Sequence, residues 1–216
     1  MPPKFPLPII YPITSGNNHP DILRLVRAAV DAEVPLFQIR EKSSSARALF
    51  DLASQAAELT RGTKTRLLVN DRSDIARAAG ADGVHLTTQS LPVEVVRKTC
   101  GAEFLIGVST HSLAEARAAC AGGADFVVFG PVFETASKRV YGEPQGLNKL
   151  SEVTGELGEC PVLAIGGVTV EHVAECFEAG ARGVAAISML NDAANISSIV
   201  RAIRSKFQTG LQDFLR

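Results

Sequence analysis

Short apolar segments alternate with longer amphipathic segments along the chain. The apolar segments are four to seven residues long, are rich in Val, Ile, Leu and Phe, and lie at residues 7–13, 36–39, 66–69, 83–86, 104–108, 126–129, 162–165 and 184–187. Continuous apolarity over so few residues is typical of a strand buried on both faces, as in a parallel sheet. The pattern therefore predicts eight buried parallel strands.

The segments between these strands carry a helical pattern. Apolar residues recur at spacings of three and four over residues 21–32, 46–60, 91–100, 113–121, 147–157 and 170–179, and residues 193–216 predict one more helix. Two helix starts show capping patterns, with Ser112 three residues before Glu115 and Thr169 before Glu171. Eight strands alternating with helices predict a (β/α)8 TIM barrel, formed as a single domain by residues 1–216. An open doubly wound sheet is the alternative, but no GxGxxG motif follows the first strand.

Composition and charge narrow the class of protein. The chain has 216 residues, of which 46% are hydrophobic and 21% charged, as in globular proteins. Its net charge of −1 offers no basic excess for nucleic acid. No apolar run approaches the ~20 residues of a membrane helix, and the first ten residues, MPPKFPLPII, do not resemble a signal peptide. We expect a cytoplasmic protein with small-molecule partners, no nucleic acid and no membrane; self-association into a homo-oligomer is left open.

The four cysteines, Cys100, Cys120, Cys160 and Cys176, are widely spaced along the chain and form no CxxC pair. This spacing argues against a disulfide framework and against a zinc site. It predicts buried, reduced thiols.

Polar residues directly after the predicted strands are the candidates for function, because the active site of a TIM barrel lies at the carboxyl ends of its strands. After the second strand, alternation places Gln38, Arg40 and Lys42 on one face. A guanidinium and an ammonium side by side suit a diphosphate. Ion pairing with a local carboxylate such as Glu41 is the alternative.

Two further strand ends carry phosphate or metal chemistry. Asn70 and Asp71 follow the third strand and could hold Mg²⁺ together with substrate phosphates, or could cap the next helix. The long irregular segment after the sixth strand contains Lys138 among hydroxyl residues. Long loops in compact domains are usually functional or mobile. We therefore expect this loop to be a lid whose Lys138 binds phosphate; a solvated surface loop is the alternative.

The last two strands indicate a second anion pocket. Gly167 and Ser188 follow the seventh and eighth strands, where TIM barrels bind phosphate through backbone N–H groups and a short helix. Ser109 follows the fifth strand and faces the expected substrate. For His85 the alternatives are a packed residue or a residue of the site. For His111 they are packing at the start of a helix or a role in the site. Two anion pockets imply a transferase that joins two phosphorylated fragments, or an enzyme that uses one pocket only.

These residues, in this order, resemble the thiamine phosphate synthase family and the thiazole tautomerases of the same (TenI-like) superfamily. The likeness spans residues 11–190. It rests on YPIT (11–14), QIREK (38–42), VNDR (69–72), GADGVHL (80–86), IGVSTHS (106–112), GADFVVFGPVFETASK (123–138), AIGGV (164–168) and AIS (186–188).

The resemblance implies an enzyme of thiamine biosynthesis. Such a transferase joins 4-amino-5-hydroxymethyl-2-methylpyrimidine diphosphate to thiazole phosphate, giving thiamine phosphate and diphosphate. Diphosphate leaves first, and the thiazole nitrogen captures the pyrimidine-methyl cation. The resemblance also assigns residues: Arg40, Lys42, Asn70 and Lys138 to the diphosphate, Asp71 to Mg²⁺, Gln38 and Ser109 to the pyrimidine, Thr135 and Ser137 to the loop, and Gly167, Ile187 and Ser188 to the thiazole phosphate. We expect catalysis from Arg40, Lys42, Ser109 and Lys138, with His85 among the substrate-binding residues.

Two departures keep other functions open. Ser90 stands where the family has a second Mg²⁺ carboxylate, so either Asp71, water and substrate hold the metal or synthase activity is weak. Glu134 replaces a proline usual in synthases, which favours the tautomerases, yet Pro131 replaces their catalytic histidine and would leave His85 or His111 as acid–base group. The alternatives are a thiazole tautomerase and a non-catalytic binder of thiamine intermediates.

Overall fold

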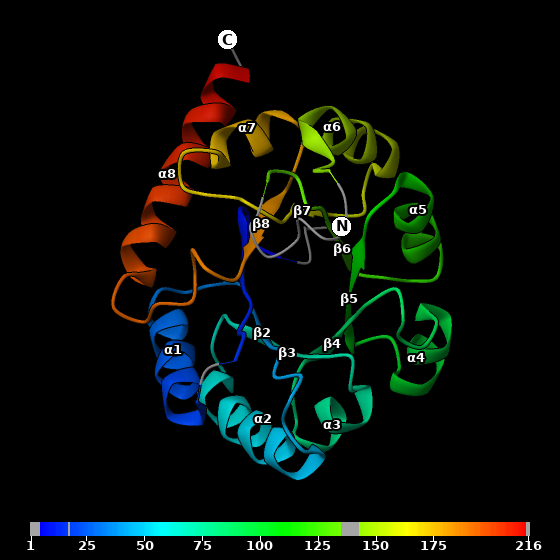
Figure 1. Cartoon of the computed structure of the whole chain (residues 1–216), viewed down its shortest axis with the longest axis vertical. Helices are drawn as coiled ribbons and strands as arrows, with labels where there is room; N and C mark the ends of the chain where they lie inside the picture. Colours follow the sequence, from blue (N-terminus) through cyan, green and yellow to red (C-terminus); the bar gives the residue numbers. More distant parts are fainter. Residues whose placement is uncertain (1–4, 17, 135–142, 215–216) are drawn as a thin grey trace.

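Eight parallel strands form a ring, and helices enclose it (Figure 1). The computed structural model describes residues 5–16, 18–134 and 143–214, with side chains to residue 209. The strands are β1 (Ile9–Pro12), β2 (Leu36–Ile39), β3 (Arg66–Asn70), β4 (Gly83–Leu86), β5 (Leu105–Thr110), β6 (Phe126–Phe129), β7 (Val162–Ala164) and β8 (Gly183–Ala186). The helices are α1 (His19–Asp31), α2 (Ala46–Thr60), α3 (Ser73–Ala78), α4 (Val93–Cys100), α5 (Leu113–Ala121), α6 (Gly146–Leu157), α7 (Val173–Glu178) and α8 (Ile196–Phe214).

The strand order confirms the predicted TIM barrel. Neighbouring strands pair in parallel from β2 through β8, and β8 then pairs with β1 from Ile9 opposite Gly183 to Pro12 opposite Ala186. The ring closes between β1 and β2 at a single bridge, Ile13 to Gln38, where the Thr14 N–H donates to the Gln38 carbonyl at 3.0 Å. All eight carboxyl ends therefore lie on one face of the ring.

Buried side chains form two layers. The outer layer lies between the strands and the helices, and the inner layer fills the ring. Phe5 packs edge-on against Phe126 at the start of β6, with ring centroids 5.8 Å apart, and so covers the amino-terminal end of the ring. Within the described part of the chain, no helix combines the length and apolarity needed to cross a membrane.

The helix predictions hold for the longer helices and fail for two short ones. The six-residue helix α3 was not predicted, because it is too short to show a helical period. The helix predicted over 170–179 is shorter than expected: α7 begins at Val173, and its N-cap residue, His172, makes no side-chain cap bond. The predicted cap at Ser112 is confirmed, since its Oγ accepts from the Glu115 N–H at 3.2 Å.

The prediction of four reduced cysteines is wrong for two of them. Cys120 in α5 and Cys160 after α6 form a disulfide across 40 residues of sequence. The helices α5 and α6 are neighbours around the ring (Figure 1), which brings together two cysteines that are far apart in sequence. Cys176 is a buried free thiol as predicted, and burial raises its pKa to about 12, whereas Cys100 is free and half-buried.

Candidate active site

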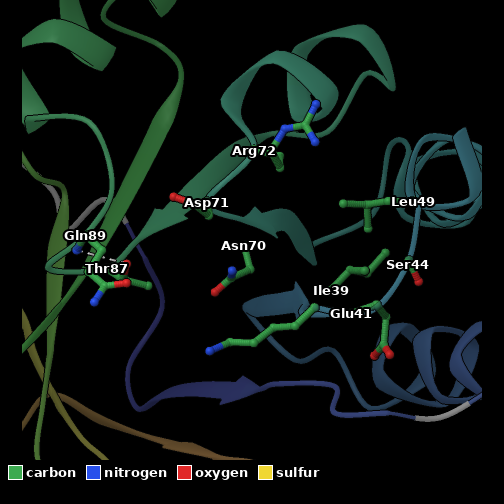
Figure 2. A pocket seen from close by; sticks show the side chains of 10 residues that line it. Ile39, Glu41, Ser44, Leu49, Asn70, Asp71, Arg72, Thr87 and Gln89 are labelled. Carbon is green, nitrogen blue, oxygen red and sulfur yellow. Dashed lines mark hydrogen bonds between the residues drawn. The ribbon is translucent and has the colours of Figure 1, made fainter. Parts of the chain in front are cut away.

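Charged and amide side chains gather at the carboxyl ends of β2 and β3. Lys42, Asn70 and Asp71 line a cavity of about 420 Å³, within the range of small-molecule sites. Figure 2 shows Asn70 between Asp71 and Glu41. Arg40 does not line this cavity; it is half-buried, and its charge acts on His85 inside the ring. The structure thus places Lys42 with Asn70 and Asp71, and Arg40 on the side of the ring interior.

The carboxylate of Glu41 does not neutralise these cations. Its Oε1 accepts from the Thr14 hydroxyl at 2.6 Å, and its Oε2 accepts from the Gly16 N–H at 3.1 Å. Glu41 therefore ties β2 to the loop after β1, and the ion-pair alternative does not apply to it. Neither Arg40 nor Lys42 forms an ion pair with any residue described by the structure.

Asp71 lies in a strained turn directly after β3. Its φ is +63°, which a non-glycine residue seldom adopts. The Arg72 N–H donates to the Asn70 carbonyl at 2.7 Å, which makes a γ-turn centred on Asp71, and the Asp71 N–H donates to the His85 carbonyl at 2.8 Å. No side chain caps α3, so the capping alternative for Asn70 and Asp71 is not observed. Strain of this kind clusters at functional sites.

Ser90 faces Asp71 across this turn. Its hydroxyl donates to Asp71 Oδ1 at 2.5 Å and accepts from the Thr87 N–H at 2.8 Å. The described residues hold no group of three or more His, Cys, Asp and Glu side chains that could bind a metal. One carboxylate can still hold Mg²⁺ when substrate phosphates and water supply the other oxygens. The donor set therefore fits a metal that arrives with a phosphorylated substrate.

Arg72 also lines the cavity, but its guanidinium is paired within the protein. Its guanidinium donates two hydrogen bonds to the carboxylate of Asp74, at 2.9 and 2.6 Å. In Figure 2 it points away from Asn70. This pairing raises the pKa of Arg72 and lowers the pKa of Asp74. Arg72 therefore forms an ion pair with Asp74 at the start of α3, and this pair has a structural role.

Hydrogen-bonded polar side chains cross the interior of the ring. Gln38 Nε2 donates to the Tyr11 hydroxyl at 2.9 Å, which lies 3.3 Å from His85 Nδ1. His85 Nε2 lies 2.9 Å from Ser109 Oγ. Burial lowers the pKa of His85 to about 3, aided by the charge of Arg40, and burial raises the pKa of Tyr11. Both side chains are therefore neutral at physiological pH.

His85 is only 2% exposed, and both of its ring nitrogens have partners. The structure favours the packing interpretation of His85 over direct ligand contact. Ser109, by contrast, is partly exposed at the end of β5. A ligand in the mouth of the ring would meet Ser109 first.

The absence of a side chain at Gly107 leaves room for the rings of His85 and Phe126. A Cβ at this position would lie 2.3 Å from Phe126 Cζ and 2.8 Å from His85 Nδ1. Phe126 in turn packs edge-on against Tyr11, with ring centroids 5.4 Å apart. A glycine two residues before Ser109 is therefore required for the interior hydrogen bonds.

The opposite edge of the mouth, at β7 and β8, offers backbone groups. Gly166 and Gly167 have φ values of +92° and +64°, and a Cβ on Gly167 would lie 2.5 Å from the Glu134 carbonyl oxygen. The N–H groups of Gly166, Gly167 and Ser188 donate to no acceptor in the described part of the chain. Ser188 is exposed in a turn over 188–190, and not at the start of a short helix as expected. Uncommitted N–H groups of this kind suit a phosphate.

Two histidines support this edge. His172 stacks on Phe133, with ring centroids 4.2 Å apart, and its Nδ1 lies 3.2 Å from the Gly167 carbonyl. His111 Nδ1 lies 2.6 Å from the Gly130 carbonyl, and the backbone N–H of His111 donates to Glu115 Oε2 at 2.6 Å. His111 thus joins the start of α5 to the end of β6. Thr135, Ser137 and Lys138 lie outside the described residues.

Sequence reasoning missed Tyr11 as part of the site. Tyr11 contributed to the family resemblance but was assigned no role. Alternation along β1 nevertheless places Ile9, Tyr11 and Ile13 in the inner layer. A phenol inside a buried ring requires a hydrogen-bond partner. That signal was present in the sequence.

Comparisons with known proteins agree with this geometry. A family model described as thiamine monophosphate synthase matches residues 10–190. A putative thiamine-phosphate synthase of Geobacter sulfurreducens is 48% identical over 170 residues, 79% of each chain, and the thiamine-phosphate synthase of Moorella thermoacetica is 38% identical over 202 residues, 94% of this chain and 95% of that protein. The structure of a thiamine phosphate pyrophosphorylase from Pyrococcus furiosus superposes with a TM-score of 0.78 at 28% identity, covering 94% of this chain and 96% of that one. The chain belongs to the thiamine monophosphate synthase family.

Proposed function

We propose that this chain is a thiamine phosphate synthase, which joins hydroxymethylpyrimidine diphosphate to thiazole phosphate and releases diphosphate. One observation carries the proposal. Arg40 and Lys42 stand at the mouth of the ring without a carboxylate partner among the described residues, because Glu41 is bound to Thr14 and Gly16. Unneutralised cations at a strand end favour a multiply charged anion. The names of the relatives point to the same reaction.

The first chemical step breaks the bond between the pyrimidine methylene carbon and the diphosphate oxygen. The bonding electrons leave with the oxygen, so negative charge grows on the diphosphate while a cation forms on carbon. Arg40, Lys42 and Asn70 bind the diphosphate in this proposal, with Lys138 added from the loop. Positive groups held where charge develops lower the barrier to this departure.

Asp71 would hold Mg²⁺ together with diphosphate oxygens and water. The bound ion would draw negative charge from the departing diphosphate. A single carboxylate, already hydrogen-bonded to Ser90, predicts weaker metal affinity than a pair of carboxylates.

The second step forms the bond between the thiazole nitrogen and the methylene carbon. The thiazole phosphate would bind to the N–H groups of Gly167 and Ser188, beside Ile187, with Thr135 and Ser137 contributing hydroxyls. Ser109 would hold the pyrimidine between the two anion pockets, with buried Gln38 bonded to Tyr11 behind it.

Neither step of this reaction moves a proton, so the synthase needs no acid–base residue. A tautomerase does need one. Pro131 occupies the position of the expected histidine, and both ring nitrogens of buried His85 are engaged. His111 Nδ1 is also engaged, by the Gly130 carbonyl. The histidines of the mouth therefore support the synthase over the tautomerase.

A product assay tests the proposal. The purified chain is mixed with pyrimidine diphosphate and thiazole phosphate, with and without Mg²⁺, and thiamine phosphate is measured. We expect product that depends on Mg²⁺. Conversion of the thiazole carboxylate tautomer without thiamine phosphate would instead establish a tautomerase. A rise in melting temperature with thiazole phosphate, but no turnover of either substrate, would establish a binder.

A further inference from the structure

The polar side chains inside the ring form one continuous chain of hydrogen bonds. It runs from Gln38 on β2 to Tyr11 on β1, then to His85 on β4 and Ser109 on β5. Gln38, Tyr11 and His85 are at most 2% exposed. Only Ser109, at the last link, reaches the mouth of the ring. The direction of each hydrogen bond therefore decides what the chain offers to a ligand.

The direction follows from counting protons. The Tyr11 oxygen accepts from Gln38 Nε2, so its single O–H is free to donate to His85 Nδ1. A neutral imidazole whose Nδ1 accepts must carry its proton on Nε2. That N–H donates to Ser109 Oγ. The Ser109 hydroxyl thus accepts a hydrogen bond from His85, and its own proton is free to donate to a ligand in the mouth of the ring.

We infer that Tyr11 and His85 are positioning residues that fix the Ser109 hydroxyl as a hydrogen-bond donor, so that the mouth favours a ligand with an acceptor at this point, such as an aromatic ring nitrogen. The identity of that ligand as the pyrimidine diphosphate rests on the proposed function. The proton order within the chain does not depend on it.

Close packing makes this order a property of the fold. Tyr11 and His85 lie with their ring centroids 5.6 Å apart, and Phe126 packs against both. Gly107 leaves no spare room, since a Cβ there would touch both Phe126 and His85. Both rings are therefore packed against a common neighbour, Phe126. The hydroxyl of Ser109 is therefore oriented before any ligand arrives.

Removing the Tyr11 oxygen should release the fixed direction of the hydrogen bond between His85 and Ser109. In Tyr11→Phe, Nδ1 of His85 loses its donor, and the imidazole can carry its proton on either nitrogen. Where the proton moves to Nδ1, the bare Nε2 accepts from Ser109, which then offers only lone pairs to the mouth. A substitution two hydrogen bonds away from Ser109 should thus convert its hydroxyl from a donor into an acceptor in part of the molecules.

Nitrogen-15 NMR of the histidine rings tests the proton order directly. The His85 signals are identified by their loss in His85→Gln. We expect the Nε2-protonated form of His85 in the unmodified chain, and a gain of the Nδ1-protonated form in Tyr11→Phe. A proton on Nδ1 in the unmodified chain would overturn the inference, because the hydrogen bonds would then run the opposite way.

Binding of an altered pyrimidine tests the selectivity. The probe is a substrate analogue in which C–H replaces the ring nitrogen that faces Ser109. We expect the unmodified chain to bind the analogue about five- to tenfold more weakly than the natural ring. Ser109→Ala should lose this preference, and Tyr11→Phe should weaken it. The KM for thiazole phosphate should stay unchanged in both variants. An undiminished preference in Tyr11→Phe would overturn the inference.

A control variant and two alternative measurements separate failure of this inference from failure of the proposed function. Thr110→Val removes a neighbouring buried hydroxyl of β5 that has no hydrogen-bond partner in the described part of the chain, and it should keep the full ring-nitrogen preference. If the unmodified chain forms no thiamine phosphate, the proposed function fails while the NMR result still decides the proton order. Calorimetry with 4-amino-5-hydroxymethyl-2-methylpyrimidine then decides the selectivity. If Tyr11→Phe fails to fold, the unmodified chain's NMR spectrum and Ser109→Ala still decide both parts.

Discussion

The two edges of the candidate site offer charge to an anion by different means. The edge at β2 and β3 presents the side chains of Lys42 and Asn70, which line one cavity, with half-buried Arg40 on the side of the ring interior. The edge at β7 and β8 presents backbone N–H groups, held close by glycines with positive φ. Side-chain sites depend on charge, whereas backbone sites depend on the absence of a Cβ. Substitutions that alter one property should therefore affect one edge and spare the other.

Lys42→Ala should have the largest effect. We expect kcat to fall about 10²- to 10³-fold, because one positive group would be missing where the leaving diphosphate gains charge. The KM for thiazole phosphate should not change. Lys64→Ala is the matched control, since Lys64 is an exposed lysine paired with Glu33 and should retain full activity. An equal loss of thiazole phosphate affinity in Lys42→Ala would show that the two edges are not separate pockets.

Gly167→Ala should affect the opposite edge. The added Cβ would meet the Glu134 carbonyl at 2.5 Å in a residue whose φ is +64°, so the loop must shift. We expect the KM for thiazole phosphate to rise about tenfold, which corresponds to the cost of a left-handed non-glycine residue. Gly62→Ala shares the positive φ, at +73°, but a Cβ there meets nothing. It should lower the melting temperature slightly and leave both KM values intact.

Ser90→Asp should sharpen the metal requirement of the charged edge. A second carboxylate beside Asp71 would attract a divalent cation more strongly, and we expect about tenfold less Mg²⁺ for half-maximal activity. Calorimetric titration with Mn²⁺ gives a second readout of the same affinity. Ser90→Asn, which adds bulk without charge, should bring no gain. An unchanged Mg²⁺ requirement in Ser90→Asp would place the metal away from Asp71.

Arg72→Ala should have the smallest effect, although Arg72 borders the same cavity. Its guanidinium is bound to Asp74, so it is not available to a diphosphate. We expect kcat to stay within about twofold, and a loss of at most ~1 kcal/mol in the free energy of unfolding, as for other exposed ion pairs. A large fall in kcat would add Arg72 to the diphosphate-binding group.

The barrel itself could be predicted because its signal is local. Buried parallel strands such as Phe126–Phe129 are apolar throughout, and long helices such as Ala46–Thr60 repeat their pattern over several turns. The helix over Ser73–Ala78 escaped because it holds fewer than two turns. The Cys120–Cys160 disulfide escaped because it depends on how two helices pack and not on any spacing in the chain.

The candidate site could be predicted only in part. The strand ends supplied Lys42, Asn70 and Asp71, which the structure brings to one cavity. That Ser90 faces Asp71 followed from the resemblance alone. The bonding of Glu41 to Thr14 and Gly16 could not be predicted, because it depends on how β1 meets β2. The interior hydrogen bonds likewise depend on the registers of four strands, which hydrophobic pattern does not specify.

The seam of the ring has a consequence for the order in which the protein is made. The strand β1 pairs over four residues with β8, whereas among the residues that the structure describes it meets β2 at a single bridge. A ribosome delivers β1 first and β8 last, so the first strand emerges long before its principal partner exists. Strands β2 to β7 can pair in turn as they appear, each with the strand just synthesised. Tyr11 therefore reaches its place beside His85 only after β8 has been synthesised, and a nascent chain that stops before β8 has no finished site.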